Sequence, residues 1–77
     1  MIQNWNDYLE MKPDVLGGKI HIKGTRIGVD LILEKLANGE GIEQILESYP
    51  HLNKHKILAC ISYAFYAVKN ESIYELA

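Results

Sequence analysis

The sequence predicts a mainly α-helical domain in which short β-strands precede a three-helix unit of the helix-turn-helix type. Pro13 and four of the six glycines lie before Val29, where short alternating segments are typical of strands and turns. After Val29, apolar residues recur at helical spacing. A chain of 77 residues has room for one hydrophobic core. We therefore expect one domain over residues 1–77, with strands and turns in 8–28, three helices in 29–70 and a tail in 71–77.

Two short strands are expected in the first part, over residues 8–11 and 19–22. The second alternates polar and apolar side chains, as a half-buried strand does. Turns at Pro13 and at Gly17 separate the two strands, and Gly24 allows the positive φ of a tight turn after them. Strands of four residues are stable only when they pair, either with each other or with a second copy of the chain.

Three helices follow, over residues 29–38, 42–48 and 53–70. Gly39 lies where helices commonly end with a left-handed residue, and the residue before Pro50 is pushed out of the helical region. The third helix begins at an asparagine, which is a good N-cap. The side chains expected to face inward from the first two helices are Leu31, Ile32, Leu36, Ile42, Ile45 and Leu46.

The third helix is apolar on two sides. One side carries Ile57, Ile61, Ala64, Phe65 and Val68. The opposite side, where a solvated helix would have Lys and Glu, carries Ala59, Tyr63, Tyr66 and Ala67. We expect the first side to pack on the other helices and the second to form a homodimer interface with the same helix of another copy. The alternative is that the tyrosines are simply exposed.

The second and third helices, with four residues between them, form a helix-turn-helix pattern. In such a unit the first residues of the second helix enter the major groove of DNA. Here these residues are Asn53, Lys54, His55 and Lys56. The formal net charge of −2 excludes a strongly basic nucleic-acid binder but allows a local cluster of this kind. Because such helix pairs also occur in domains that never contact DNA, a protein-interaction module without DNA binding is the alternative.

A second basic region lies between residues 12 and 26. It contains four cationic residues against Asp14 alone, with His21 among them. The four are Lys12, Lys19, Lys23 and Arg26. Lysines commonly protect the edges of strands from unwanted pairing, which accounts for Lys19 and Lys23 without any ligand.

No catalytic or metal-binding constellation is expected. His51 precedes the third helix, so it does not share a helical face with His55 as zinc ligands would. The single cysteine, Cys60, forms no internal disulfide and fits a reducing cytoplasmic compartment. The longest apolar stretch, residues 57–68, is too short to span a bilayer. With no nucleophile–base pair in the sequence, we expect neither an enzyme nor a cofactor.

Several blocks distributed over the chain belong to one recurring pattern. They are Gly18-Lys19, Gly24-Thr25-Arg26-Ile27, Val29, Ala37-Asn38-Gly39-Glu40 and the segment from Ile45 to Leu52. With these blocks, residues 8–67 resemble the domain-of-unknown-function family 433. The resemblance implies a homeodomain-like trihelical fold and an antitoxin of a VapBC-like toxin–antitoxin pair, whose partner is a PIN-type ribonuclease toxin. The family often has proline where this chain has Ile20 and Gly28, so the backbone there is expected to be less rigid.

The block at residues 24–27 also has a physical interpretation of its own. Gly24 makes the turn, Thr25 hydrogen-bonds the local backbone, and Ile27 anchors the turn on the core. The planar guanidinium of Arg26 has two candidate roles. It clamps acceptors within the fold or across a dimer, or it contacts a phosphate or the toxin.

Overall fold

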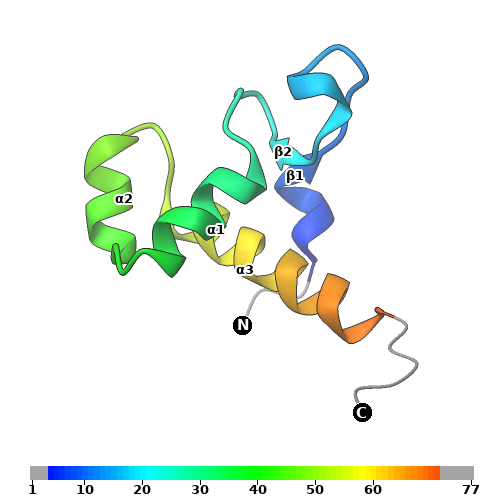
Figure 1. The fold of residues 1–77 in the computed structure, drawn as a ribbon. Helices are drawn as coiled ribbons and strands as arrows, with labels where there is room; N and C mark the ends of the chain where they lie inside the picture. The colour runs from blue at the N-terminus through cyan, green and yellow to red at the C-terminus, as the bar shows by residue number, and fades with distance from the viewer. Residues whose placement is uncertain (1–3, 72–77) are drawn as a thin grey trace.

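The computed structural model describes residues 4–71, in which three helices follow a small β-hairpin (Figure 1). The elements, in chain order, are the 3-10 helix η1 (Trp5–Asp7), β1 (Leu9–Glu10), the 3-10 helix η2 (Leu16–Gly18), β2 (His21–Ile22), α1 (Val29–Ala37), α2 (Ile42–Ser48) and α3 (Lys54–Lys69). The predicted class, mainly helical with short N-terminal strands, is confirmed. Of the expected tail, residues 72–77 lie outside the described part of the chain.

The hairpin strands β1 and β2 are antiparallel, with Leu9 opposite Ile22 and Glu10 opposite His21. The backbone of Gly28 pairs with His21 on its other side. Both residues of β2 are buried, and His21 is only 1% exposed. The predicted alternation of a half-buried strand is wrong at His21, whose ring nitrogens contact Glu10 and the Lys19 carbonyl.

All three helices begin and end within one residue of the predicted positions. Asn53 caps α3, because its Oδ1 accepts a hydrogen bond from the Lys56 N–H at 3.0 Å. After α1, Gly39 has the left-handed φ of +94°. At the start of α2, the Gly41 N–H donates to the side-chain oxygen of Gln44 at 2.9 Å. Local signals of this kind set the helix boundaries.

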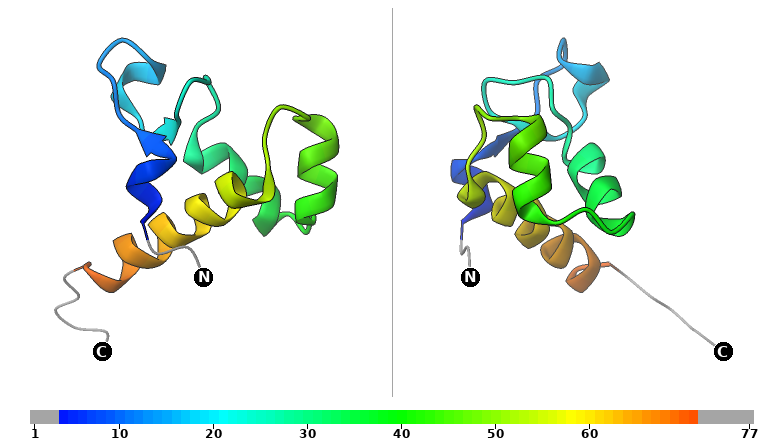
Figure 2. Two further views of the ribbon diagram at one scale, coloured as in Figure 1. Left: turned by 180° about the vertical axis from the view of Figure 1, so that it is seen from behind. Right: turned by 90° about the vertical axis from the view of Figure 1, so that its left-hand side faces the viewer.

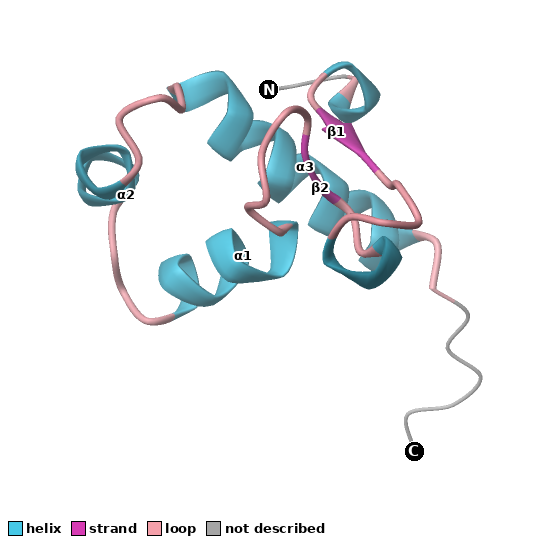
Figure 3. Ribbon diagram, turned by 90° about the horizontal axis from the view of Figure 1, so that it is seen from above, coloured by secondary structure: helices cyan, strands magenta, loops and turns pink. Residues whose placement is uncertain are grey.

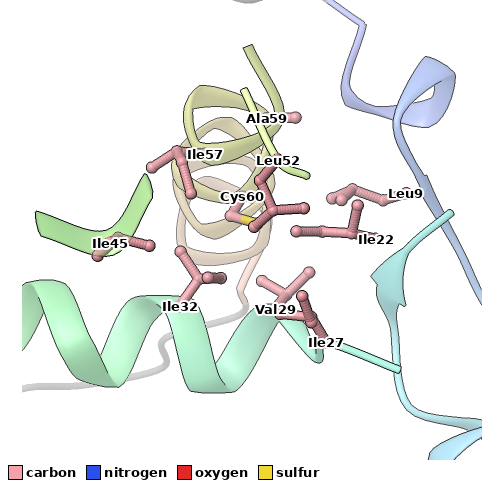
Figure 4. Close-up of a cluster of buried hydrophobic side chains, with 10 residues drawn as sticks. All are labelled: Leu9, Ile22, Ile27, Val29, Ile32, Ile45, Leu52, Ile57, Ala59 and Cys60. Atoms are coloured by element: carbon pink, nitrogen blue, oxygen red, sulfur yellow. The ribbon is translucent and has the colours of Figure 1, made fainter. Parts of the chain in front are cut away.

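A cluster of buried apolar side chains joins the hairpin to the three helices (Figure 4). Ile32 of α1, Ile45 of α2 and Ile57 of α3 are each 0% exposed. Burial of a side chain of this size stabilises a fold by about 1.5–3 kcal/mol. Leu52 directly precedes α3 and Ile22 ends β2, and both belong to this cluster. The core therefore fixes the start of α3 relative to the hairpin.

The side of α3 that packs on the domain differs from the predicted one. Ile57 faces the core as expected, but Ile61 is 39% exposed, Phe65 56% and Val68 64%. The opposite side is partly covered by the chain's own N-terminal segment. There the Trp5 ring packs edge-on against Tyr63, with ring centroids 4.8 Å apart. Both sides of α3 are apolar, so periodicity alone left its rotation open, and the contact with Trp5 decides it.

The second and third helices have the arrangement of a helix-turn-helix pair. Seen from above, α2 is viewed nearly end-on while α1 and α3 run across the view (Figure 3). The view from behind shows the C-terminal half of α3 extending beyond the other helices (Figure 2). None of the helices in residues 4–71 has the length and apolar character needed to cross a membrane.

Candidate functional site

The first turn of α3 presents three basic side chains, Lys54, His55 and Lys56, called here the α3 basic cluster. Lys54 and His55 are exposed, and Lys56 is half-buried. The ion pairs within residues 4–71 are made by Lys12, Lys19, His21 and Lys35. No acidic side chain in that part of the chain therefore neutralises the α3 basic cluster.

Asn53, the fourth residue predicted to contact DNA, already has a structural role. Its Oδ1 accepts the capping hydrogen bond from the Lys56 N–H, which uses one of its two lone pairs. Its side-chain N–H groups make no hydrogen bond within residues 4–71, and the residue is exposed. Asn53 can therefore donate to an acceptor on a base edge or a phosphate while it caps α3.

Acidic side chains limit the extent of this basic surface. Glu43 and Glu47 are exposed on α2. Glu40, just before α2, pairs with Lys35 of α1 at 3.6 Å. Charges more than about 8 Å apart are largely screened at physiological ionic strength. The α3 basic cluster therefore acts on a ligand that directly contacts the start of α3.

The turn at residues 24–27 has the geometry that its sequence predicts. Gly24 has a φ of +75°. The Thr25 hydroxyl donates to the Ile22 carbonyl at 2.8 Å and accepts from the Ile27 N–H at 3.0 Å. Ile27 is 8% exposed and belongs to the core. The Thr25 hydroxyl thus closes the turn, and the buried Ile27 anchors its end on the core.

Arg26 does not act as a clamp within the fold. Its side chain is exposed and makes no hydrogen bond or ion pair within residues 4–71. The turn needs no such clamp, because the Ile22 carbonyl is already bonded by Thr25 through both its hydroxyl and its backbone N–H. The prediction of an internal clamp is wrong, and the guanidinium remains available to a group outside the chain.

A buried polar pair holds the hairpin to this turn. His21 Nε2 lies 3.1 Å from Glu10 Oε2, and its Nδ1 lies 3.0 Å from the Lys19 carbonyl oxygen. A carbonyl only accepts, so Nδ1 is the donor in that bond. The same Glu10 oxygen accepts from the Gly24 N–H at 3.4 Å. One carboxylate thus ties β1 to both β2 and the turn.

Burial acts to raise the pKa of the Glu10 carboxyl. Hydrogen bonds with Gly24 and His21, together with the charge of Lys12 4.0 Å away, outweigh the effect of burial, so the pKa of Glu10 lies below its usual value.

The sequence interpretation missed the pair of Glu10 and His21. Antiparallel pairing of the expected strands end to end places Glu10 opposite Ile20, and the observed register is shifted by one residue. A histidine between two isoleucines was the only local signal of it.

The four residues predicted for a dimer interface have separate environments. Ala59 is 0% exposed, so its assignment is wrong, and Tyr63 is half-buried against Trp5. Tyr66 is 50% exposed, with its ring 5.5 Å from that of Trp5, and Ala67 is exposed. A different set, Ile61, Phe65 and Val68, forms an exposed α3 stripe at spacings of four and three residues.

Cys60 and His51 are two further side chains of types that act as nucleophiles or metal ligands. Cys60 is buried, and burial raises the pKa of its thiol to about 12, so it stays protonated at neutral pH. His51 lies edge-on to the Tyr49 ring, with centroids 6.4 Å apart. In the described part of the chain, no three His, Cys, Asp or Glu side chains gather as a metal site requires.

The hairpin, the 24–27 turn and most of the helix-turn-helix pair lie in a part of the chain that matches a known protein family. The family described as "Protein of unknown function (DUF433)" matches residues 9–64. The chain belongs to the DUF433 family. The matched span includes the hairpin, α1, α2 and most of α3, and it ends within α3.

The chain is also similar to a bacterial protein and to a solved structure. "Uncharacterized protein y4eO" of Sinorhizobium fredii (strain NBRC 101917 / NGR234) is 38% identical over 52 residues, which is 68% of this chain. The match covers 24% of y4eO, so this chain spans about a quarter of that relative's length. The crystal structure of a DUF433 member from Anabaena variabilis ATCC 29413 superposes with a TM-score of 0.71 at 27% identity. That match covers 80% of this chain and 58% of the other.

Proposed function

We propose that this DUF433 member is a non-enzymatic antitoxin-type regulator of the cytoplasm. It binds a cognate toxin, a PIN-type ribonuclease, and it also binds operator DNA through the α3 basic cluster. The resemblance of its sequence blocks to antitoxins supports the first half. The observation that carries the second half is an exposed, uncompensated cationic cluster on the first turn of the second helix of a helix-turn-helix pair.

The chemistry of the cluster fits a duplex backbone. Lys54 and Lys56 supply point charges for phosphates, and the Asn53 side chain can donate an additional hydrogen bond. The net charge of −2 repels DNA elsewhere on the surface. We therefore expect weak binding by the chain alone, which weakens further as salt rises, and firmer binding when the toxin contributes charge or a second pair of helices.

A homodimer is part of the proposal, through the exposed α3 stripe of Ile61, Phe65 and Val68. Their spacing puts all three on one line along the helix. Two copies related by a twofold axis would cover the stripe with an identical stripe. Such a dimer doubles the number of α3 basic clusters presented to DNA. This stripe replaces the interface predicted from the sequence, two residues of which are covered within one chain.

The alternative function is a protein-interaction module without DNA binding. The exposed α3 stripe favours it, because contiguous exposed apolar side chains mark protein-binding surfaces. The acidic residues of α2, Glu43 and Glu47, lie on the helix that precedes the α3 basic cluster and oppose a polyanion. In this case Lys54 and Lys56 would be ordinary solvent-facing side chains that bind no ligand.

The toxin half is tested by co-expression with the product of the neighbouring open reading frame, which this proposal expects to be a PIN-type ribonuclease. An antitoxin forms a stable complex that co-elutes in size-exclusion chromatography and suppresses the ribonuclease activity of the purified toxin. Co-elution without suppression supports the interaction module, and absence of any complex contradicts the antitoxin function.

The DNA half is tested by gel shift with the upstream promoter, with and without the toxin. Lys54→Glu together with Lys56→Glu reverses the charge of the α3 basic cluster and should abolish the shift. A charge reversal elsewhere, Lys69→Glu at the other end of α3, is the control and should retain the shift. A parent chain that shifts no DNA even at low salt with toxin present contradicts the DNA half.

A further inference from the structure

A second cationic surface lies on the turn at residues 23–26, called here the basic turn. Lys23 and Arg26 are exposed, and neither side chain makes an ion pair or hydrogen bond within residues 4–71. The other two cations of this region are compensated: Lys12 lies 4.0 Å from Glu10, and Lys19 lies 3.4 Å from Asp30. The predicted protection of a strand edge does not explain Lys23, which lies beyond the end of β2.

The backbone of the basic turn is held in place from several sides. The Lys23 N–H donates to the Tyr8 carbonyl at 2.9 Å, and the Ile22 N–H donates to the Ile27 carbonyl at 3.0 Å. The Thr25 hydroxyl and the Glu10 carboxylate close the interior of the turn. The two cations therefore project from a preorganised backbone, which lowers the entropy cost of binding a ligand.

The basic turn and the loop that leads into α3 rise above the core in the same views. Figure 1 shows the teal turn and the yellow-green loop both above α1, and both views of Figure 2 agree. Ile22 before the turn and Leu52 before α3 belong to one buried cluster, which fixes the two segments relative to each other (Figure 4).

We propose that Lys23 and Arg26 contact the phosphate backbone of the duplex on which α3 lies, as a second DNA-binding element beside the helix. This inference rests on the proposed DNA binding of the α3 basic cluster. A phosphate fits the site because the Arg26 guanidinium can donate two parallel hydrogen bonds to it, with Lys23 as a nearby point charge. Residues 23–26 include no aromatic side chain for stacking on a base, so the element positions the duplex and does not read its sequence.

The test is the salt dependence of binding to the promoter duplex, measured by fluorescence anisotropy for the parent and for Lys23→Gln with Arg26→Gln. Each cation that touches a phosphate contributes about 0.9 to the slope of log K against log salt, so the slope of the double variant should be smaller by about 1.8 per chain. Lys69→Gln is the control, because it removes a cation at the far end of α3. It should leave the slope unchanged. Arg26→Lys should retain part of the slope that Arg26→Gln removes.

Three outcomes overturn the inference. If the parent binds and the Lys23/Arg26 double variant has the same slope as Lys69→Gln, the basic turn does not touch DNA, while the role of the α3 basic cluster stands. If the double variant binds DNA normally but no longer binds the toxin, Arg26 and Lys23 recognise carboxylates of a protein. If the parent binds no duplex at any salt, the inference fails together with the proposed DNA binding. Thermal melts of each variant verify that the fold is intact.

Discussion

At the scale of single residues, one carboxylate and one hydroxyl give the N-terminal half of the domain its shape. Glu10 lies 3.1 Å from His21 Nε2 and accepts from the Gly24 N–H, and Thr25 bonds the backbone on both sides of its turn. A hydrogen bond that joins two chain segments fixes the position of one segment relative to the other, so a few such bonds restrict the backbone strongly. The hairpin has only two residues per strand and depends on these hydrogen bonds.

The Glu10–His21 pair predicts a specific acid sensitivity. Because the pKa of Glu10 is lowered in the fold, its contribution to stability is present above the usual value of 4.5 and is lost as the pH falls through the lowered value. Glu10→Gln should therefore flatten the dependence of Tm on pH below about pH 4.5, where the parent loses stability. Glu43→Gln is the control, because Glu43 is exposed and makes no ion pair within residues 4–71. Parallel Tm profiles for the parent and Glu10→Gln would contradict the assignment.

Substitution of Thr25 should destabilise the fold, whereas substitution of its neighbour Arg26 should change stability little. Thr25→Val removes both hydrogen bonds of the hydroxyl and should lower the free energy of unfolding by about 1–2 kcal/mol. Thr25→Ser keeps the hydroxyl and should retain most of that stability. Arg26→Ala should change it by less than about 0.5 kcal/mol, since exposed side chains without partners contribute little. Urea unfolding measures all three, and a loss of stability in Arg26→Ala comparable to Thr25→Val would restore the internal clamp.

At the scale of elements, two helices begin after a glycine, and the two glycines differ in one hydrogen bond. Gly28 before α1 has a φ of −72°, and its N–H makes no hydrogen bond within residues 4–71. Gly41 before α2 has a φ of −84°, but its N–H donates to Gln44. Both φ values are near that of proline, so the N–H decides which site tolerates proline.

Gly28→Pro should therefore be neutral or raise stability by up to about 1 kcal/mol, because proline restricts the unfolded chain. A Cβ at this position would collide with the Asp30 carboxylate, which must rotate away and release its surface ion pair with Lys19. Gly41→Pro should be destabilising, because Gln44 loses its donor. Thermal unfolding of the two variants gives the comparison. A lower Tm for Gly28→Pro than for Gly41→Pro would show that the start of α1 is more constrained than its backbone angles indicate.

The elements themselves were predictable, and their mutual orientation was not. Asn53, Gly39 and Pro50 act within a few residues of their own positions, so the helix ends are determined locally. The rotation of α3 depends on Trp5, which lies 58 residues before its contact Tyr63, and two apolar sides made the spacing of α3 ambiguous. The Glu10–His21 pair escaped prediction for the same reason, since it depends on a strand register that local patterns leave open.

At the scale of the whole molecule, a domain of 77 residues with an exposed apolar stripe has a strong reason to associate. The exposed α3 stripe lies along the C-terminal half of α3, while the α3 basic cluster lies on its first turn. Association and ligand binding would thus use opposite ends of one helix. A dimer through the stripe leaves the basic clusters of both copies accessible.

Sedimentation at micromolar concentration should therefore give about twice the chain mass of 8.8 kDa. Phe65→Glu places an unpaired carboxylate in the proposed interface and should yield a folded monomer. Tyr66→Glu is the matched control on the side of Trp5 and should remain dimeric. A monomeric parent, or dissociation by Tyr66→Glu alone, would contradict the assignment of the stripe.

Binding of duplex DNA by the start of α3 is tested most directly by the salt dependence of promoter binding. Anisotropy titrations of the chain in complex with its toxin, from about 50 to about 200 mM salt, should give an affinity that falls steeply as salt rises. Lys54→Gln with Lys56→Gln should reduce the slope by about 0.9 for each lysine that touches a phosphate, and should lower the affinity at every salt concentration. Binding that is equally tight and equally salt-dependent in the variant, or no binding at the lowest salt, would contradict a DNA-binding role for this helix.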